Sequence, residues 1–370
     1  MLMKIAQVAH LFPPATGGIE HHVYHLSKEL SNLKNEVTVY TTMVPGAKKE
    51  EKMDGIKVRR FSSLNFPLFS SVRFAPGMFF SLLSSDAEVF ASHGYGSVMP
   101  LITSIAALLK RKPFVFTLHG YPKLKGKKKF FQLFYKYFFA SIFLRIAKKV
   151  IVVSRASIQD IRGEVDEKKL IYIPNGIDTE IFTFQPPEGK NAITYVGRLD
   201  EYKGVDTLVR AYAKIKKDFP DTELRVVGKD EGIKEGLQKL ANSLGVKIHF
   251  SEVPYEEMSK VYSDSAAVIL PSKYEGFSLV WLEAMASGRP MFSTPVGDAP
   301  ALFEQVYGKS AEDFLFKDEE ELVKKLTNYL KDPQKHHKVI ERAEYIVKEE
   351  YSWENVARLT LNTYKESLKR

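Results

Sequence analysis

Cysteine is absent from this 370-residue chain, which excludes disulfides, thiol nucleophiles and zinc–thiolate sites. Apolar runs are short: Val98–Leu109 and Phe138–Leu144 fall well below the ~20 residues that a membrane-spanning helix needs. The first residues lead directly into an apolar run, Ile5–Ala9, that is too brief for a signal peptide and is not followed by a cleavage site. We therefore expect a soluble cytoplasmic protein.

Two sequence patterns of cofactor enzymes are also missing. No Asp-x-Asp pair occurs, so we expect no divalent metal held by paired aspartates and no cofactor beyond the substrate itself. The G-x-G-x-x-G pattern does not follow the first predicted strand, and Gly94-Tyr95-Gly96 lacks the third glycine. A dinucleotide-dependent dehydrogenase is therefore poorly supported.

Acidic residues are missing between Lys110 and Lys149, a stretch that holds twelve basic residues. Within it, the lysines of 123–129 precede a block of aromatic residues that runs from Phe130 to Phe143. Ammonium groups next to aromatic rings are typical of a membrane-surface contact, so we expect an anionic membrane surface as one partner. A core helix with a solvated basic lead-in remains the alternative. Nucleic acid is not expected, because the aromatics form a block rather than an interleaved stacking platform.

What remains is ordinary globular composition, with 44% hydrophobic and 27% charged residues over a length that suits two domains. Short β-branched runs alternate with amphipathic stretches in both halves, which predicts parallel sheets covered by helices on both faces. We predict an α/β fold of two Rossmann-like, doubly wound domains facing a cleft. The predicted domains are 1–183 and 184–350, separated by a linker near Phe184–Gly189, with a helix at 351–370 that returns to the N-terminal domain.

Ligands of such sheets bind beyond the carboxyl ends of the strands, so the loops there are the candidate sites. Gly17 and Gly18 follow the first strand and open a helix, where backbone N–H groups favour an anion. A tight strand-to-helix turn would use the same glycines. After the strand Ala192–Val196, Arg198 and Lys203 could bind one phosphate. The alternative is that neighbouring carboxylates neutralise both cations at the surface.

The segment 271–290 supports the ligand interpretation. Glu275 lies in the loop after a strand, and Glu283 lies eight residues later, within a predicted helix Leu279–Ser287. The residues from Gly276 to Ser278 supply unpaired N–H groups at the start of that helix, which suits a phosphate. Carboxylates accept hydroxyl hydrogen bonds, so two glutamates beside a phosphate site could hold a sugar and a ribose.

Four motifs together resemble the retaining family 4 glycosyltransferases of the GT-B fold. They are Glu275-x7-Glu283, the Gly197–Gly204 loop, Pro174–Asp178 and Gly17–Glu20. The resemblance runs through most of the chain in the expected order. One departure is that Gly297–Ala301 lacks the glutamate of the family's Gly-Gly-x-Pro-Glu pattern.

This resemblance implies a nucleoside-diphosphate-sugar donor, UDP- or GDP-linked, and a sugar or lipid-linked acceptor whose hydroxyl receives a hexose with retention. The catalytic residues that it implies are His119 beside the reacting sugar, Arg198 and Lys203 on the diphosphate, and Glu275 on the donor sugar. The donor-binding residues are Gly17, Gly18, Asn175, Gly276, Phe277, Ser278 and Glu283, the last on the ribose. A sugar-nucleotide epimerase of the same fold and a non-catalytic, membrane-associated sugar-nucleotide binder remain the alternatives.

Overall fold

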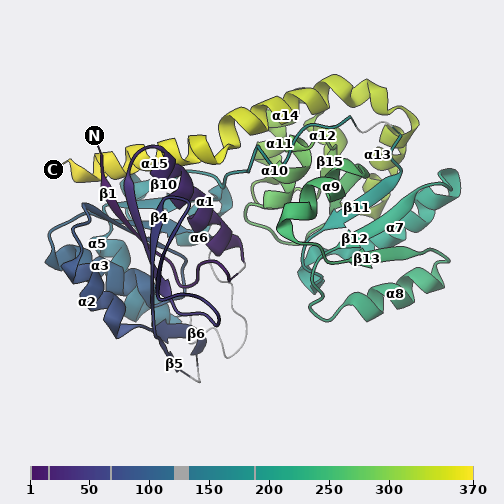
Figure 1. Ribbon diagram of the computed structural model, residues 1–370. Helices are drawn as coiled ribbons and strands as arrows, with labels where there is room; N and C mark the ends of the chain where they lie inside the picture. The colour runs from purple at the N-terminus through teal and green to yellow at the C-terminus, as the bar shows by residue number, and fades with distance from the viewer. Residues whose placement is uncertain (1, 16, 67–68, 121–132, 187–188, 370) are drawn as a thin grey trace. The chain divides into compact units, whose positions relative to one another are not determined.

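The computed structural model describes residues 2–15, 17–66, 69–120, 133–186 and 189–369. The chain forms two compact units (Figure 1). One contains Met1–Gly176 together with Trp353–Arg370, and the other contains Ile177–Ser352. Each unit is built on its own predominantly parallel sheet, so the predicted α/β fold with two Rossmann-like domains is confirmed.

The first unit contains a mixed sheet in which only the edge strand β3 runs antiparallel to its neighbour. In spatial order its strands are β10 (Leu170–Tyr172), β9 (Lys149–Val152), β8 (Phe114–Leu118), β7 (Val89–His93), β1 (Lys4–Val8), β2 (Glu36–Thr42), β4 (Ile56–Phe61) and β3 (Glu50–Met53). A separate hairpin is formed by β5 (Leu64–Phe66) and β6 (Phe69–Phe74). The helices are α1 (Gly18–Asn32), α2 (Pro76–Ser84), α3 (Met99–Leu109), a π-helix (Lys136–Ala140), α5 (Ser141–Ile146), α6 (Arg155–Ile161) and α15 (Trp353–Leu368).

Helices cover both faces of this sheet. Successive side chains of a strand point to opposite faces, so Phe90 and Phe116 pack into a core with α2, α3 and α5. Their neighbours Val89 and Val115 pack into a second core with α1 and α15. Burial on both faces explains why β7, up to its last residue His93, and β8 are continuous apolar or small-residue runs instead of alternating patterns.

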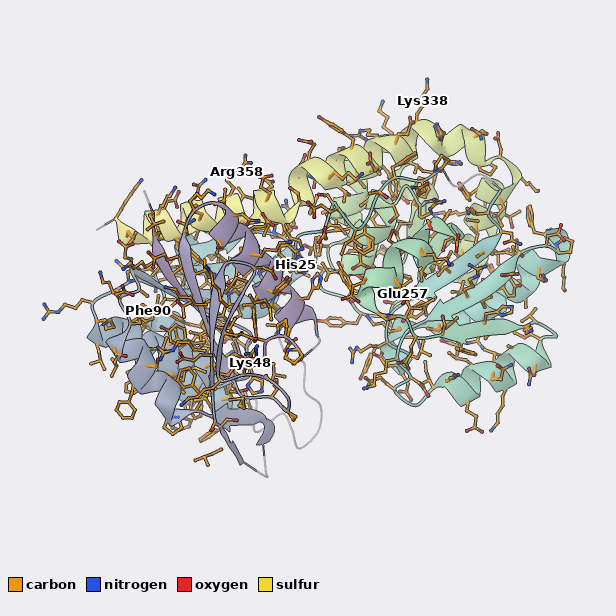
Figure 2. The ribbon with its side chains drawn as sticks, in the orientation of Figure 1. His25, Lys48, Phe90, Glu257, Lys338 and Arg358 are labelled. Carbon is orange, nitrogen blue, oxygen red and sulfur yellow. The ribbon has the colours of Figure 1, made fainter. Side chains whose placement is uncertain are left out.

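The second unit contains a five-stranded, all-parallel sheet. In spatial order its strands are β13 (Ile248–Ser251), β12 (Glu223–Val227), β11 (Ala192–Val196), β14 (Ser265–Leu270) and β15 (Met291–Ser293). The helices are α7 (Val205–Asp218), α8 (Lys234–Ser243), α9 (Met258–Ser263), α10 (Leu279–Ala286), α11 (Ala299–Tyr307), α12 (Ala311–Phe314), α13 (Glu319–Lys331) and α14 (His337–Tyr351). Among the side chains labelled in Figure 2, Phe90 is buried, whereas Lys338 on α14 and Arg358 on α15 are exposed.

The N-terminal part of the first unit ends at Gly176, seven residues before the domain boundary that was predicted after residue 183. Ile177 donates its backbone N–H to the carbonyl of Tyr351 over 2.7 Å, and both lie in the second unit. The Phe182 ring packs against Tyr255 and Tyr262 at centroid distances of 5.7 and 5.6 Å. Residues 177–183 thus join the second core. The second boundary lies after Ser352, and α15 belongs to the first unit.

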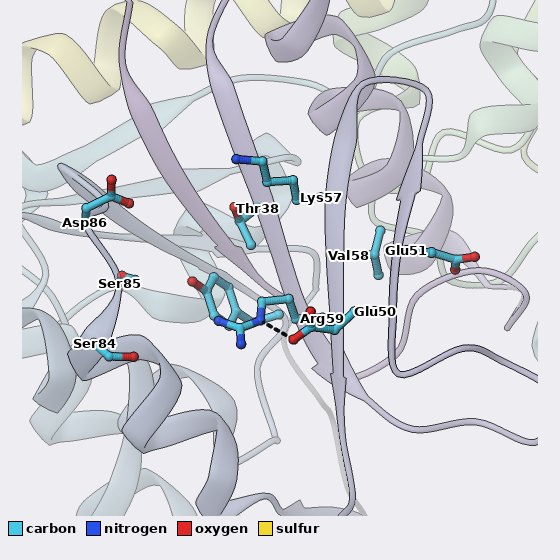
Figure 3. A pocket seen from close by; sticks show the side chains of 10 residues that line it. Thr38, Glu50, Glu51, Lys57, Val58, Arg59, Ser84, Ser85 and Asp86 are labelled. Atoms are coloured by element: carbon cyan, nitrogen blue, oxygen red, sulfur yellow. Dashed lines mark hydrogen bonds and ion pairs between the residues drawn. The ribbon is translucent and has the colours of Figure 1, made fainter.

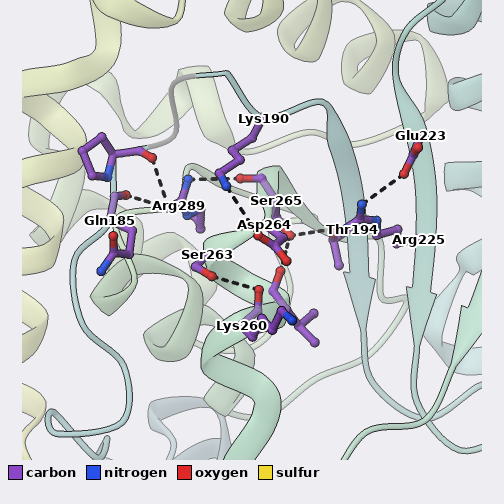
Figure 4. A network of polar contacts seen from close by, with 12 residues as sticks. Gln185, Lys190, Thr194, Glu223, Arg225, Lys260, Ser263, Asp264, Ser265 and Arg289 are labelled. Atoms are coloured by element: carbon purple, nitrogen blue, oxygen red, sulfur yellow. Dashed lines mark hydrogen bonds and ion pairs between the residues drawn. The ribbon is translucent and has the colours of Figure 1, made fainter.

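Residues 187 and 188 of the segment predicted as a linker lie outside the described residues, and its described residues 184–186 and 189 lie inside the second unit (Figure 4). Arg289 is buried and donates from Nη2 to the carbonyl of Gln185 over 2.6 Å and from Nη1 to the carbonyl of Ser265 over 3.1 Å. A Cβ at Gly288 would meet the Phe184 ring at 2.6 Å, so the segment packs closely here. Arg289 thereby links this segment to the start of β14. The segment does not separate the two units.

The strand orders locate the topological switch point of each sheet. In the second unit the chain proceeds from β11 outward through β12 and β13, and then returns to the other side with β14. The loops at this switch point are 197–204 after β11 and 271–278 after β14. In the first unit the corresponding point lies between β1 and β7. Ligands of open α/β sheets bind at such points.

Candidate functional site

The two loops at the switch point of the second unit are joined by an ion pair between Lys203 and Glu275. Both side chains are largely buried, at 17% and 13% exposure. Ser272 Oγ donates a second hydrogen bond to Glu275, over 3.2 Å. Within the described residues, both of these bonds go to Oε1. Oε2 is therefore the oxygen that can accept a hydrogen bond from a ligand hydroxyl.

Glycines bring the same two loops into close contact. Gly204 has φ +62°, and a Cβ there would lie 2.1 Å from the carbonyl oxygen of Pro271. Only glycine tolerates both the left-handed backbone and this close approach. Lys273 also donates its N–H to the carbonyl of Tyr202 over 2.7 Å. The Lys203–Glu275 pair is consequently held by backbone contacts on both sides.

Arg198 differs from Lys203 in its surroundings. Its side chain is 64% exposed, and its Nη2 lies 3.6 Å from Asp200 Oδ2. The sequence left open that neighbouring carboxylates neutralise both cations at the surface. This describes Arg198 better than Lys203, whose partner is Glu275. An exposed ion pair of this kind contributes little to stability. The Arg198 guanidinium can therefore exchange Asp200 for an anionic ligand at small cost.

The three residues from Gly276 to Ser278 precede helix α10, which begins at Leu279. The first N–H groups of a helix have no intrahelical partner, so they are able to donate to an anion of the kind that the sequence predicts there. Phe277 is half-buried, and its ring lies 6.0 Å from Trp281 and 6.1 Å from Tyr351. These contacts fix the course of the backbone into the helix.

Glu283 is buried in α10 at 6% exposure. Tyr262 of α9 donates a hydrogen bond of 2.6 Å to its Oε2. Burial raises the pKa of Glu283 to about 7, and the Tyr262 hydrogen bond opposes that rise. A carboxylate in such a position can accept hydroxyl hydrogen bonds from a ligand once it is ionised.

In the first unit, Gly17 and Gly18 stand at the start of α1. A Cβ at Gly18 would meet no atom within 4 Å, so the fold of this unit does not itself require glycine there. The loop that precedes these glycines is anchored by Arg60, which donates from Nη2 to the carbonyl of Pro13 over 2.6 Å. The two glycines thus lie at the topological switch point of the first sheet, which is between β1 and β7.

His119 follows β8 and belongs to a cluster of imidazoles in the first unit. Its Nε2 lies 3.2 Å from Nδ1 of His93, which ends the neighbouring strand β7. The His22 ring, on α1, packs edge-on against His119 with a centroid distance of 4.4 Å. Nδ1 of His22 lies 3.0 Å from Asn175 Oδ1, so the structure places Asn175 against this histidine. Burial lowers the pKa of all three histidines, that of His22 to about 4.

His119 is predicted from the sequence, whereas His22, His93 and Tyr262 are not. His93 ends a strand in the same way as His119 ends the next one, and carboxyl ends of parallel strands share one edge. That alignment was the signal available for His93. His22 and Tyr262 lie on helices whose packing partners are distant in sequence, and no local pattern indicates them.

A separate pocket of about 760 Å³ lies at the β2–β4 edge of the first unit (Figure 3). It is lined by residues of β2, β3, β4 and the end of α2, among them Arg59 and Glu50, whose Nε and Oε1 lie 3.0 Å apart. None of the predicted site residues contributes to its lining. We do not assign the site to it.

Comparisons with known proteins agree with the two-unit architecture. The sequence model of Glycosyltransferase Family 4 matches residues 16–181, and that of Glycosyl transferases group 1 matches residues 176–345. The MMP alpha-(1->4)-mannosyltransferase of Mycolicibacterium hassiacum is 27% identical and is similar over 100% of this chain and 99% of the relative.

Two solved structures share the fold. Sucrose-phosphate synthase from Thermosynechococcus elongatus matches with a TM-score of 0.76 at 21% identity, over 98% of each chain. Anabaena HepE in complex with UDP-glucose matches with a TM-score of 0.71 at 20% identity, over 98% of this chain and all of that one. Together the two family models span residues 16–345. The chain therefore belongs to the family 4 glycosyltransferases of the GT-B fold.

Proposed function

We propose that this glycosyltransferase moves a hexosyl group from a nucleoside diphosphate sugar to an acceptor hydroxyl, with retention at the anomeric carbon. The observation that carries the proposal is the Lys203–Glu275 pair at the switch point of the second sheet, beside the N-terminus of α10. It combines a cation for a diphosphate with a carboxylate oxygen for a sugar hydroxyl.

Several features support a donor of this class. Lys203, the exposed Arg198 and the first amides of α10 supply positive charge and N–H donors for a diphosphate. Oε2 of Glu275 is able to accept a hydrogen bond from a hydroxyl of the sugar, and the buried Glu283 from the hydroxyls of the ribose. HepE, which has the same fold, is known in complex with UDP and with UDP-glucose.

The reaction breaks the bond between the anomeric carbon and the β-phosphate oxygen. A new bond forms from the acceptor oxygen to the same face of that carbon. The acceptor proton passes to the departing phosphate oxygen, so no further base is needed. The leaving diphosphate gains negative charge in the transition state, where preorganised donors contribute most. We therefore assign Arg198 and Lys203 to stabilising the leaving group, and His119 to the reacting sugar.

The acceptor in this proposal is a sugar or lipid-linked hydroxyl, and an anionic membrane surface is a partner. The lysines of 123–129, and Phe130 with them, lie outside the described residues. The described segment that follows exposes several apolar side chains: Leu133, Phe134, Tyr137, Phe138 and Ile142. A buried core helix would not expose such a set, which favours contact with a lipid interface. In the part of the chain that the structure describes, no helix has the length and apolarity to cross a bilayer.

An assay of donor consumption tests the function. UDP- and GDP-hexoses are first screened by thermal shift, because ligand at 100 times its dissociation constant stabilises the fold by ~2.7 kcal/mol. The stabilising donor is then incubated with and without sugar and lipid-linked acceptors, and the anomeric proton coupling of the product reports its configuration. Turnover only with an acceptor, and retention, are expected. Conversion of the donor without any acceptor would indicate an epimerase, and binding without turnover a non-catalytic protein.

A further inference from the structure

Three imidazoles of the first unit face one another at the carboxyl edge of its sheet. One ring nitrogen from each of His22, His93 and His119 lies within 4.8 Å of the other two. His22 and His93 are 3% and 1% exposed, whereas His119 is half-buried, which leaves an approach from its side. The three residues come from different elements, α1, β7 and the end of β8, so only the tertiary fold assembles them.

The spacing suits a tetrahedral metal ion. Zinc binds imidazole nitrogens at about 2.0–2.1 Å, which places two ligating nitrogens about 3.3 Å apart. Nδ1 of His93 and Nε2 of His119 are 3.2 Å apart already. A ring nitrogen of His22 lies within 4.8 Å of a ring nitrogen of each of the other two, so a closure of up to about 1.5 Å would complete the set of ligands.

Amide oxygens already occupy the outer positions that such a site uses. Metal-binding histidines usually donate their other ring N–H to an oxygen, which fixes the tautomer. Nε2 of His93 lies 2.7 Å from Oε1 of Gln7, whose own Nε2 donates to Tyr364 over 3.1 Å. Nδ1 of His22 lies 3.0 Å from Oδ1 of Asn175. Because both amide oxygens are acceptors, the remaining nitrogens, Nδ1 of His93 and Nε2 of His22, keep their lone pairs for a metal.

We propose that His22, His93 and His119 form a binding site for a late first-row transition-metal ion, with Zn²⁺ as the ion of choice. Three neutral imidazoles suit zinc, copper or nickel, whereas Mg²⁺ and Mn²⁺ prefer oxygen ligands. The fourth position is open to water or a ligand. Zinc binding takes the lone pair of His119, so the ion blocks the role assigned to that residue and inhibits transfer. That second consequence rests on the proposed function, whereas the binding does not.

Zinc uptake by the full chain, free of affinity tags, tests the site without any sugar substrate. Competition with a chromophoric zinc chelator gives stoichiometry and affinity, and Co²⁺ replacing Zn²⁺ gives visible absorption bands diagnostic of a tetrahedral site. We expect one zinc ion per chain. His22→Gln and His93→Gln lower the zinc affinity at least about 100-fold, since even loss of an outer-sphere partner typically costs 10–100-fold. His249→Gln, at an exposed histidine of the second unit, is the matched control and retains the affinity.

The proposal is overturned if the wild-type chain takes up no stoichiometric zinc, or if His249→Gln weakens uptake as much as the cluster variants. Equal affinity in all variants would overturn it as well. Circular dichroism shows whether the two cluster variants fold. If they do not fold, two other measurements test the site, namely zinc binding by Asn175→Ala and the Co²⁺ spectrum of the wild type. Asn175→Ala is expected to bind zinc 10–100-fold more weakly. Wild-type cobalt without tetrahedral bands would exclude the site.

Discussion

Tyr262 of α9 and Glu283 of α10 are joined by a buried hydrogen bond of 2.6 Å. Both side chains belong to the core of the second unit, where the surroundings include Phe182 and Tyr255. Burial is the dominant effect on the carboxyl, and it raises the pKa of Glu283 to about 7 from an ordinary 4.5. Glu283, which we propose binds the ribose, is therefore also a carboxyl whose ionised form is disfavoured in the folded protein.

This pKa predicts a pH dependence of stability. A carboxyl whose folded pKa is raised stabilises the fold at pH values below the unfolded pKa, and the contribution is lost as the pH rises through about 7. A shift from 4.5 to about 7 corresponds to on the order of 3 kcal/mol. Glu283→Gln does not titrate, so relative to wild type it should gain stability between pH 5 and pH 8. Urea unfolding of both proteins at the two pH values measures this; parallel pH profiles would contradict the assignment.

Three substitutions test the proposed donor site. Arg198→Ala, Lys203→Ala and Glu275→Ala should each lower kcat at least tenfold. The two cations are preorganised donors to a developing charge, which are typically worth 10²–10³ in rate. Glu275 accepts from the donor sugar and holds Lys203 in place. The fold should survive, since all three lie in loops or helix starts. Lys214→Ala removes a comparable ammonium that lies 2.7 Å from Glu319 at the surface, and it should leave the rate unchanged. Steady-state kinetics with thermal melts provide both readouts. Normal turnover in all three variants would remove this site from consideration.

Two glycines should respond oppositely to alanine. Gly18→Ala has space for its Cβ and lies in a helix, so stability should hold or rise by ~0.4–1 kcal/mol. Donor KM should increase, because the proposed ligand approaches that backbone. Gly204→Ala should instead destabilise the fold, since its Cβ would lie 2.1 Å from the Pro271 carbonyl at φ +62°. Melting temperatures and KM values distinguish the two effects. A Gly18→Ala variant that loses stability would show that this glycine serves folding.

Metal removal should not abolish the proposed transfer. Lys203, Arg198 and the α10 amides supply the positive charge that a divalent ion would otherwise provide. Activity measured in excess EDTA should therefore persist, and it should rise if the preparation carries inhibitory zinc on the histidine cluster. Loss of activity that Mg²⁺ or Mn²⁺ restores would reveal a metal site that we have not identified.

Membrane contact is tested by co-sedimentation with vesicles that contain anionic lipid. Changing the five lysines of 123–129 to Gln should release the chain, because each lysine near such a surface contributes ~1 kcal/mol. Binding of the wild type should weaken as salt rises, since the Debye length falls from ~10 Å at 0.1 M to ~3 Å at 1 M. Phe138→Ser, at an exposed aromatic, tests the apolar part. If the wild type stays in the supernatant at low salt, the segment is a solvated surface and the membrane is not a partner.

Local pattern was sufficient for a strand such as β11. Its predicted range, Ala192–Val196, coincides with the structure, since it is a short, buried run rich in β-branched and aromatic residues. The antiparallel edge strand β3 was not predicted, because Glu50–Met53 is charged and half-exposed, and its pairing with β4 depends on the turn between them. Chain order alone likewise did not reveal that Phe184 and Gln185 pack against Gly288 and Arg289.

The amino-acid sequence by itself determined the class of fold and the motifs that place this chain among the glycosyltransferases, because periodicity, turn glycines and motif spacing are local properties. The tertiary structure decided which of those residues meet. Lys203 reaches Glu275 across 72 residues because β11 and β14 are neighbours in the sheet. His93 reaches His119 because β7 and β8 end at the same edge, and Tyr262 reaches Glu283 through helix packing. Sheet order and packing arise from burial of the whole core, which no segment encodes alone.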